Sequence, residues 1–581
     1  MFKDLFQKKK YAVVPTERTK RDIPEGLMNR CPKCGTIQFS KELEKKETIP
    51  DKIIHLWNVS GNIHPTSLTS LTRAERYQKL GFFSLLYIAQ SMGKVNLPGE
   101  VHLYVVSDQL QDVNGTELLQ PEKAPLLGPV KVIPQEYPNV KCCNLDVEFR
   151  TDSPRSLKRV SEQIMTEIRS DIPEVIVAYR GENRWVQCYE KVYLDKQVLK
   201  RFTPQKGGVY LITGGLGGMG LVMAKYLSKT EKITLILTTR KSFPSRTQWE
   251  EWIQNNRPRD PISRIIKKLQ KLEDRGARVW VISADVTDRQ KMKKELEKAE
   301  NRLGPVTGVI HAAGLPGEGI LQLKKPEAAR KILAPKIQGT LILYELLKNH
   351  QLDFFVLCSS IASVLGGIGL GDYCAANAFL DAFALKHQKN KKLNLISINW
   401  DMWGQVGMGL KTQMPQELKE WFERELRNGI TSGEGVDVFR RIIGWSGHSN
   451  MVVSTRDLQA RIELWLKRGL IKQQQKALKE EKQPQYSRPS LTTDYTAPKT
   501  EVEKKVARIW CKLFGIDKVG RTDNFYELGG HSLLATTLLS ELRKIFGSTI
   551  SIRDVIDNPT VSELSLLIEK SQEPNNRAAH G

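Results

Sequence analysis

A glycine-rich stretch in the middle of the chain has the residue types and spacing needed to bind a phosphorylated nucleotide. The apolar run VYLIT (residues 209–213) leads directly into GGLGGMG, in which Gly215, Gly217 and Gly220 form the pattern G-x-G-x-x-G before the helix-like run LVMAKYL. Such glycines let the backbone approach a pyrophosphate, whose charge is favoured at a helix N-terminus. The strand–loop–helix context predicts a nucleotide site. A tight turn without a nucleotide is the alternative.

The residue after the next apolar run indicates which nucleotide is bound. The run ITLILTTR ends at Arg240. In dinucleotide-binding folds an acidic residue in this region binds an unphosphorylated ribose, whereas an arginine accommodates a 2′-phosphate. Arg240 therefore favours NADPH over NADH.

A second candidate for chemistry lies near the end of the chain, in DNFYELGGHSLLATTLL (residues 523–539). Ser532 follows two glycines and precedes an apolar helical run. Serine is a favoured helix N-cap. A cap explains the hydroxyl but not Asp523, Phe525 and Leu528 at their spacing. The other interpretation is that the hydroxyl of Ser532 carries a covalently attached arm.

The elements that must position these features follow from the order of the apolar runs. From residue 207 to 460, strand-like runs such as RVWVISAD, FFVLCSS and LNLISINW alternate with helical patterns, which indicates a doubly wound parallel sheet. Residues 50–200 hold further strand-like runs and one amphipathic helix candidate, LGFFSLLYIAQSM. Residues 466–498 become polar and contain prolines, as a flexible tether would, and a compact helical pattern follows.

Composition excludes several classes of protein. The chain has 581 residues, too many for one ordinary core, and no apolar run approaches the ~18–20 residues that span a bilayer. The start, MFKDLFQKKKYAVV, lacks the features of a secretory signal, so we expect a cytoplasmic protein. The net charge is +24, but lysines alternate with glutamates as on solvated helix faces, so we expect no nucleic-acid partner. The eight scattered cysteines suit reduced thiols.

Four motifs in the central region carry a family resemblance. TGGLGGMG, SADVTD, HAAG and SSIASVLGGIGLGDYCAAN occur in this order. Together they resemble the ketoreductase domain of type I, multi-domain polyketide synthases and related fatty-acid synthases, a branch of the short-chain dehydrogenases. The resemblance implies a Rossmann-like fold and four active-site residues: Tyr373, Ser360, Lys336 and Asn377.

These residue types suit the reduction of a ketone. Hydride delivery to a carbonyl creates negative charge on oxygen, which a hydrogen-bond or proton donor must stabilise. Tyr373 would be the acid if a nearby lysine and the cofactor ribose lower its pKa. Ser360 would orient and polarise the ketone. Lys336 and Asn377 would set the electrostatics and any proton relay.

The resemblance also assigns contacts with the cofactor. It places Asp285 at the adenine, and Ala313 and Gly314 beside the nicotinamide. No metal site is expected. The residues expected to bind NADPH are Thr213, Gly214, Gly215, Gly217, Gly218, Met219, Gly220, Arg240, Asp285, Val286, Ala313 and Gly314.

The resemblance extends upstream and leaves one question open. HLW, QEYP and CNLDVE, within residues 51–200, are similar to the structural half of such reductases, which braces the catalytic half and binds no cofactor. Reductases of one stereochemical class carry Leu-Asp-Asp where Leu315–Gly319 reads LPGEG, and the opposite class has a tryptophan where Leu365 stands. The missing aspartates favour the L-alcohol, but the stereochemical outcome stays open.

The serine motif resembles a different family. DNFYELGGHSLL is similar to the phosphopantetheine attachment site of carrier proteins, D-x-F-x-x-L-G-G-x-S-L. The resemblance implies a four-helix carrier domain with 4′-phosphopantetheine attached to Ser532 by a phosphopantetheinyl transferase. A tethered arm would bring acyl intermediates to the neighbouring reductase at high effective concentration.

The first residues resemble a third family. MNRCPKCGTIQFSKELEKK is similar to the start of the acetyl-CoA carboxylase carboxyltransferase β subunit, which completes a four-cysteine zinc ribbon. Here Cys31 and Cys34 supply half of such a site, and the next cysteine is Cys142. Structural zinc takes four ligands. We therefore expect a fused remnant that is disordered and binds no zinc.

The sequence predicts an NADPH-dependent reduction of a β-ketoacyl thioester in an assembly line whose ketosynthase and acyltransferase belong to other chains or modules. The alternatives are a carrier or docking module with a silent reductase fold, and a carboxyltransferase accessory protein. The predicted units are the N-terminal remnant 1–47, the structural subdomain 48–204, the catalytic subdomain 205–465, the linker 466–498, the carrier 499–572 and a disordered tail 573–581.

Overall fold

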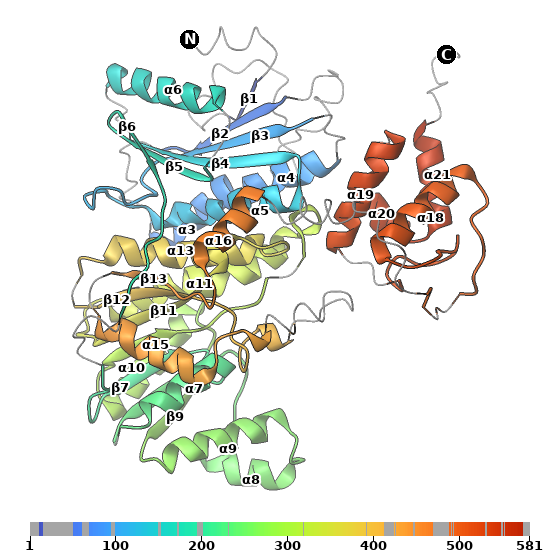
Figure 1. Ribbon diagram of the computed structural model, residues 1–581. Coiled ribbons are helices and arrows are strands. Elements are labelled where there is room, and N and C mark those ends of the chain that lie inside the picture. The colour runs from blue at the N-terminus through green and yellow to red at the C-terminus, as the bar shows by residue number, and fades with distance from the viewer. Residues whose placement is uncertain are drawn as a thin grey trace.

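A computed structural model shows two α/β sheets stacked through helices, with a small helical domain beside them (Figure 1). The structure describes residues 11–14, 50–60, 69–94, 99–148, 153–170, 174–194, 202–230, 232–317, 319–390, 392–411, 423, 426–445, 448–468, 487–489, 491, 493–528, 532–547, 550 and 552–572.

The larger sheet is parallel and doubly wound, as predicted. Its order is β13-β12-β11-β10-β7-β8-β9. All five residues of the inner strand β7 are buried, because helices cover both faces of the sheet. The strands are β7 (Val209–Thr213), β8 (Thr234–Thr239), β9 (Arg278–Ser283), β10 (Gly308–His311), β11 (Phe354–Ser360), β12 (Leu395–Trp400) and β13 (Asn450–Val452).

Two helical layers cover this sheet, each with its own apolar core. One core contains residues of α10 (Arg289–Leu303), α11 (Pro326–Leu347) and α13 (Gly371–His387). The other contains residues of α7 (Gly218–Leu227), α9 (Pro261–Glu273) and α15 (Ser432–Gly444). The remaining helices of this half are α8 (Trp249–Asn255), α12 (Ala362–Leu365) and α16 (Leu458–Ile462).

The smaller sheet runs in sequence order, with parallel neighbours from β1 to β5 and an antiparallel β6. Helix α6 lies on the face away from the larger sheet, and α3, α4 and α5 lie on the other face (Figure 1). The elements are β1 (Tyr11–Val14), β2 (Lys52–Asn58), α3 (Ser70–Gln78), α4 (Ser84–Lys94), β3 (Val101–Ser107), α5 (Leu127–Glu136), β4 (Val140–Val147), α6 (Pro154–Arg169), β5 (Ile176–Arg180) and β6 (Asn183–Val186).

Strand β1 differs from the expectation at four residues. Residues 1–47 were expected to be disordered, and within them the structure describes Tyr11–Val14, which pair in parallel with β2. The edge of a sheet has unpaired N–H and C=O groups, to which another strand can add. Cys31 and Cys34 lie outside the described residues.

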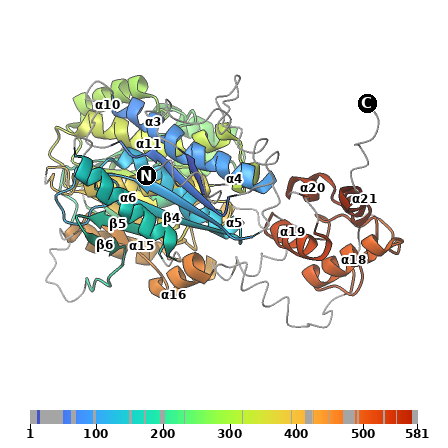
Figure 2. The same cartoon turned by 90° about the horizontal axis from the view of Figure 1, so that it is seen from above.

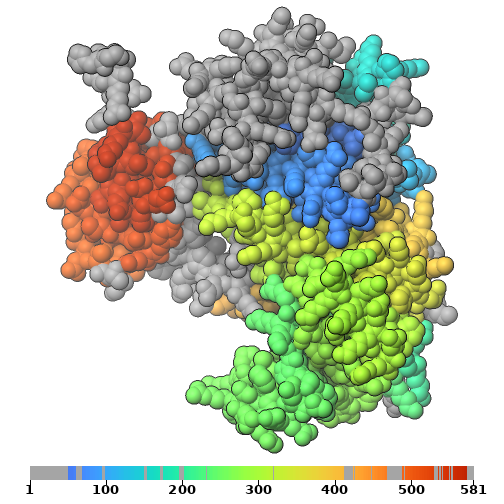
Figure 3. Space-filling model, turned by 180° about the vertical axis from the view of Figure 1, so that it is seen from behind, coloured from blue at the N-terminus to red at the C-terminus, as the bar shows by residue number. Residues whose placement is uncertain are grey.

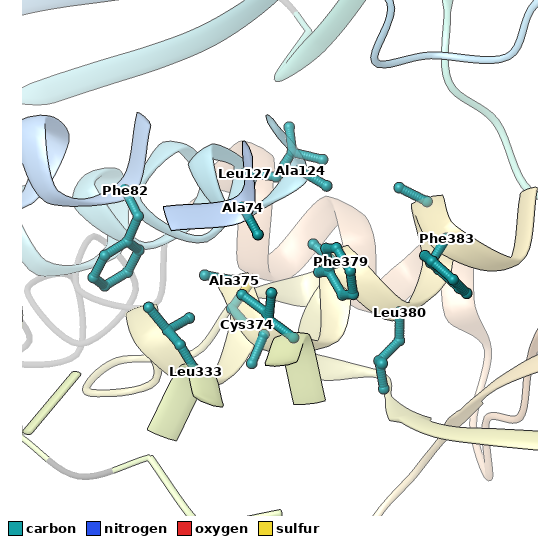
Figure 4. Close-up of a cluster of buried hydrophobic side chains, with 14 of the residues drawn as sticks. Ala74, Phe82, Ala124, Leu127, Leu333, Cys374, Ala375, Phe379, Leu380 and Phe383 are labelled. Carbon is teal, nitrogen blue, oxygen red and sulfur yellow. The ribbon is translucent and has the colours of Figure 1, made fainter. Parts of the chain in front are cut away.

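The two sheets share one hydrophobic core rather than meeting at a polar interface. Phe82 and Leu127 from the smaller half belong to the same buried cluster as Phe379 and Leu380 of α13 (Figure 4). A Cβ atom added to Gly128 of α5 would lie 2.3 Å from the carbonyl oxygen of Gly371. The backbones of α5 and α13 therefore approach each other closely, just before Tyr373.

The C-terminal domain consists of α18 (Glu501–Phe514), α19 (Ser532–Phe546), α20 (Ile552–Asp557) and α21 (Val561–Gln572). Thr500 caps α18 in a capping box with Glu503. The domain forms a separate lobe beside the α/β part (Figures 2 and 3).

The residue before the predicted linker and the last part of the linker each contact a folded unit. The carbonyl of Trp465 accepts a hydrogen bond from Gln135 at 3.3 Å, on the α/β side. Arg488 forms an ion pair with Asp523 of the helical domain at 2.6 Å, and Leu491 packs against that domain's core. The tether between these contacts is therefore shorter than residues 466–498.

Candidate active site

The residues of the predicted nucleotide site gather at one edge of the larger sheet. β7 and β10 are neighbours, although the chain continues from β7 to β8 on one side and from β10 to β11 on the other. Such a reversal opens a crevice outside the carboxyl ends of the strands, where doubly wound folds bind ligands. Gly214 follows β7 directly, and Ser360 ends β11.

The glycine-rich loop folds back on itself, and two of its glycines lie where a side chain would be crowded by backbone. Gly214 has a φ of +65°, and a Cβ atom there would lie 3.1 Å from the carbonyl oxygen of Ala312. A Cβ atom at Gly220 would lie 2.6 Å from the carbonyl oxygen of Gly214. These close approaches place the N-terminus of α7 at the crevice.

The first turn of α7 fits a pyrophosphate. Its N-cap is Gly217, which makes no side-chain cap, and Gly217 and Gly218 are both exposed. Uncapped backbone N–H groups at a helix N-terminus favour phosphate oxygens. Gly215 is buried between the loop and β8, where its Cβ atom would lie 2.9 Å from Leu237. Met219 is half-buried.

The next two strands bring further predicted residues to the same edge. Arg240 follows β8 and is exposed. Asp285 lies just after β9, and its Oδ1 atom accepts hydrogen bonds from the Thr287 backbone at 2.9 Å and hydroxyl at 2.7 Å. Val286 is buried and contacts α11, where a Cβ atom at Gly339 would lie 2.8 Å from it. Asp285 therefore also fixes the turn that leads into α10.

A buried histidine links the glycine-rich loop to the HAAG segment. Nδ1 of His311 lies 2.6 Å from the hydroxyl of Thr213, and Nε2 lies 3.0 Å from the carbonyl of Pro335. Burial, with the nearby charge of Lys336, lowers the His311 pKa to about 3. The ring is therefore neutral: Nε2–H donates to Pro335, and Nδ1 accepts from Thr213. The Thr213 hydroxyl also accepts from the N–H of Ala313 at 3.3 Å.

The four residues predicted to be catalytic come together from three elements. Ser360 ends β11, Lys336 lies in α11, and Tyr373 and Asn377 are one turn apart in α13. Nζ of Lys336 lies 5.9 Å from the centre of the Tyr373 ring and donates to the Cys358 carbonyl at 2.7 Å. Asn377 donates to the Tyr373 carbonyl at 2.7 Å. A Cβ atom at Gly314 would lie 3.1 Å from the Lys336 side chain, so the predicted nicotinamide-side glycine also makes room for this lysine.

Burial sets the charge states in this group. Burial raises the pKa of Tyr373, while hydrogen bonds with Ser360 and Asn377 act in the opposite direction. Burial also lowers the pKa of Lys336 to about 8. The lowering of the Tyr373 pKa expected from the sequence depends on a nearby lysine together with the cofactor ribose, and the amine of Lys336 is here bonded to the Cys358 carbonyl. Tyr373 therefore keeps its proton at neutral pH, as a proton donor must.

Three side chains of α5 that we did not single out hold the segment between Ser360 and Tyr373. Lys131 donates to the Ser363 carbonyl. Gln135 donates to the Leu365 carbonyl at 2.7 Å and accepts from the Gly367 N–H at 2.8 Å. Glu136 accepts from the N–H of Leu321 at 2.7 Å and of Gly369 at 2.9 Å. The bracing half thus determines the path of an active-site loop, and Gln135 and Glu136 lie in the QEYP stretch.

A buried ion pair lies beside Tyr373. Lys324 and Asp372 are 2.7 Å apart, with side chains 1% and 0% exposed, and Asp372 accepts from the Tyr373 N–H at 2.9 Å. Burial raises the pKa of Glu136 to about 7, although Lys324 acts to lower it. Residues so far apart in the sequence give no local motif that would have revealed this cluster.

In the C-terminal domain, the motif residues around Ser532 have structural roles. Asp523 is fully buried, forms the ion pair with Arg488 and accepts from the Gly520 N–H at 2.7 Å. Phe525 and Leu528 are buried in the domain's core. They fix the segment that leads to Ser532, the first residue of α19. Residues 529–531, with both glycines, lie outside the described residues.

No further chemical centre emerges from the described part of the chain. Within it, no cluster of three or more histidine, cysteine, aspartate or glutamate residues could hold a metal ion. Among the same residues, no helix combines the length and the apolar character needed to cross a membrane.

Comparison with known families identifies both regions. Residues 208–405 match the family described as KR domain, and residues 504–568 match the phosphopantetheine attachment site. A 6-methylsalicylic acid synthase of Arthrobotrys oligospora is 32% identical over 321 residues, which is 55% of this chain and 17% of that protein. Polyketide synthase PksM of Bacillus subtilis is 29% identical over 308 residues, or 53% of this chain and 7% of that protein. The chain thus spans under a fifth of the length of these relatives.

Solved structures agree on the fold. The crystal structure of an N-terminal ketoreductase from the macrolactin assembly line has a TM-score of 0.57 and 24% identity, over 73% of this chain and 76% of that one. A ketoreductase domain from the bacillaene assembly line has a TM-score of 0.55 and 23% identity, over 79% of this chain and 95% of that one.

Proposed function

Since this chain pairs a ketoreductase domain of the polyketide synthase type with a phosphopantetheine attachment domain, we propose that it reduces a β-ketoacyl thioester to a β-hydroxyacyl thioester. The substrate is held by 4′-phosphopantetheine on Ser532, and NADPH is the reductant. The single observation that carries this proposal is the meeting of Lys336, Ser360, Tyr373 and Asn377 beside the uncapped N-terminus of α7.

The residues present fit a nicotinamide dinucleotide. Gly217 and Gly218 leave backbone N–H groups for the pyrophosphate, Arg240 is exposed where a 2′-phosphate would lie, and Asp285 and Val286 border the adenine side. Ala313 and Gly314 line the crevice beside Lys336. When bound, the cofactor supplies a hydride to the carbonyl carbon of the substrate.

The protein's own residues protonate the substrate oxygen and stabilise the negative charge that develops. As the carbonyl π bond breaks and a C–H bond forms, Tyr373 gives its phenolic proton to the substrate oxygen. Ser360 hydrogen-bonds the same oxygen and orients it. The cationic amine of Lys336 stabilises the resulting phenolate, and solvent returns a proton to Tyr373 with Asn377 ordering the path. The net uptake is one hydride and one proton per alcohol formed.

The partners follow from the same chemistry. A phosphopantetheinyl transferase must attach the arm to Ser532, and ketosynthase and acyltransferase modules must supply the acyl intermediate. The protein acts on tethered acyl chains in the cytoplasm and requires neither nucleic acid nor a membrane.

Intact mass measurement tests the proposal. The purified chain is loaded at Ser532 with a β-ketoacyl pantetheine by a promiscuous transferase, and NADPH is added. We expect the carrier-bound species to gain the mass of two hydrogen atoms. Loading without reduction would instead support a carrier with a silent reductase fold, and failure to load would remove the carrier assignment.

Arg240 is expected to set the cofactor preference. Changing Arg240 to alanine should raise the KM for NADPH by about 10- to 100-fold, because a charged hydrogen bond to a phosphate is worth ~1.5–3 kcal/mol, and should leave the KM for NADH unchanged. Steady-state kinetics with both cofactors checks this. Lys229, exposed near the opposite end of α7, is the matched control for loss of a positive charge. Equal losses with NADPH and NADH would contradict the assignment.

The pH dependence of reduction is expected to report on Lys336. Its pKa is about 8, so the amine is cationic below this pH and loses its charge above it. The kcat/KM for the ketone should therefore be level between pH 6 and 7.5 and fall above about pH 8. A Lys336→Met variant should be slower and should lack this fall. A fall centred at pH 10 or higher would point to Tyr373 instead.

A further inference from the structure

Three chain segments meet beside Tyr373, and a buried carboxylate joins them. Glu136, at the end of α5, accepts hydrogen bonds from the N–H groups of Leu321 and Gly369. Each of these N–H groups directly follows an isoleucine, Ile320 or Ile368. Glu136 is 4% exposed and is followed by Tyr137. The carboxylate therefore keeps Tyr137, Ile320 and Ile368 close together, although they lie far apart in the sequence.

The two isoleucines contact the carrier domain rather than the core of the reductase. Ile320 is only 2% exposed, and it belongs to the same apolar cluster as carrier residues such as Trp510, Phe525 and Leu538. Ile368 packs against that cluster as well. The carrier thus covers loop residues that the reductase alone would leave at its surface.

A basic side chain of the carrier lies near the same loops. Arg543, in the last turn of α19, is close enough to Tyr137 of the reductase for its charge to act on the pKa of the Tyr137 hydroxyl. Its guanidinium also donates to the Ile550 carbonyl at 2.8 and 3.1 Å, so it has a fixed position within the carrier. Helix α19, which begins at Ser532, is the carrier helix that faces the reductase in both ribbon views (Figures 1 and 2).

The covered loops are also those that border the catalytic tyrosine. A Cβ atom at Gly317 would lie 2.8 Å from the Cβ atom of Tyr373, and one at Gly369 would lie 3.7 Å from the backbone of Gly319. Residues 315–317 and 319–321 therefore lie beside residues 366–370 along the edge of the crevice. A carrier seated on them stands next to the site where its acyl chain must react.

We propose that Tyr137, Ile320 and Ile368 form a docking surface for the carrier domain of this same chain, and that docking there presents the arm on Ser532 to Tyr373. This inference rests on the proposed function. It adds which surface receives the carrier, which helix of the carrier binds, and that the contact is mainly apolar.

The size and character of the docking surface suit a carrier that must also visit other enzymes. Two isoleucines and one tyrosine form a patch far smaller than a stable protein–protein interface, so the contact is transient. A tether raises the local concentration of the carrier to the millimolar range, at which a weak contact is sufficient. Because the contact is mainly apolar, moderate salt should affect it little.

The test compares two substrates in one variant. An Ile320→Glu variant is assayed with a β-ketoacyl group on Ser532 and with a diffusible β-ketoacyl N-acetylcysteamine thioester, each with NADPH in single turnover. We expect the tethered reaction to slow at least about tenfold, because a carboxylate is poorly tolerated in an apolar contact. The diffusible reaction should stay within twofold of the wild type. Ile368→Glu should behave in the same way.

Leu323 provides a matched control. It lies three residues from Ile320 in the same segment, is 41% exposed, and is not part of the cluster that contains the carrier core. Leu323→Glu introduces the same charge and should change neither reaction. The melting temperature of each variant reports whether the reductase remains folded.

The other possible outcomes would contradict the role of Ile320, the position of the carrier or the proposed function. Equal slowing of both reactions would show that Ile320 shapes the active site and is not a docking residue. An unchanged tethered rate would place the carrier elsewhere. If the wild type reduces neither substrate, the proposed function fails first. A mixture of two variants tests whether the carrier docks on its own chain or on a second copy. Tyr373→Phe chains carry the loaded substrate but lack the acid, whereas Ser532→Ala chains have the acid but carry no substrate. Reduction in this mixture as fast as in the intact chain would assign the surface to the carrier of a second copy.

Discussion

Replacing Tyr373 with phenylalanine is expected to slow reduction of the diffusible thioester by about 10²–10⁴-fold, the usual contribution of a positioned acid. The variant removes one hydroxyl from a side chain whose ring lies 5.9 Å from the Lys336 amine and leaves the packing of α13 intact. Single-turnover oxidation of NADPH measures the loss. Binding of NADPH, followed by its fluorescence, should be nearly unchanged.

A second tyrosine provides the control for this experiment. The Tyr226 hydroxyl donates to the Phe202 carbonyl at 3.1 Å, on the other helical layer of the same half. Tyr226→Phe should keep full activity. If Tyr373→Phe also keeps its activity, the proton comes from another donor, and the role given to Tyr373 is wrong.

Replacing Ser532 with alanine is expected to abolish attachment of phosphopantetheine completely, since no other oxygen occupies that motif position. Incubation with coenzyme A and a promiscuous transferase, followed by intact mass, should show the added group on the wild type and none on the variant. Reduction of the diffusible thioester should be unaffected, because Ser532 belongs to the carrier alone.

A second serine of the carrier domain provides the control for the Ser532→Ala variant. Ser571, near the end of α21, donates to the Ile568 carbonyl at 2.7 Å. Ser571→Ala should be loaded as fully as the wild type. An added group on the Ser532→Ala chain would assign the arm to a different residue.

The parts of the fold that depend on a local pattern could be predicted from the sequence. The glycine-rich loop needs glycine at Gly214, whose φ is +65°, and at Gly220, where a Cβ atom would lie 2.6 Å from the carbonyl oxygen of Gly214, and such requirements repeat at fixed spacing. Tyr373 and Asn377 lie one helical turn apart, so their register within α13 can be read from the sequence. The family match over residues 208–405 confirms the fold predicted from these motifs.

Contacts between a side chain and the backbone of a distant segment could not be predicted from the sequence. Lys131 and Gln135 bind the carbonyls of Ser363 and Leu365, and any residue at those two positions would present the same carbonyl. The residue types at positions 363 and 365 therefore do not indicate that Lys131 and Gln135 bind there. Ile320 was overlooked for a similar reason, because one apolar residue in a loop has no periodicity to mark it.

The carrier motif shows a different limit. Residues 504–568 match the phosphopantetheine attachment site family, as the motif predicted, while the role of Ser532 itself stays a prediction. The pattern did not distinguish the residue that would carry the arm from residues that stabilise the domain. The structure shows that Asp523 forms an ion pair with Arg488 and that Phe525 is buried in the core. The pattern also missed that Arg488, in the predicted linker, belongs to the carrier's packing.

Because the two sheets share one hydrophobic core, the two α/β halves cannot be separated without exposing apolar surface. Phe82 and Leu127 pack in the same cluster as Phe379 and Leu380, so a cut between the sheets would expose apolar surface on both pieces. The two halves should accordingly melt in one cooperative transition. Recombination between assembly lines would have to exchange them together, because α13 of one parent would not fit α5 of another without matched residues such as Gly128.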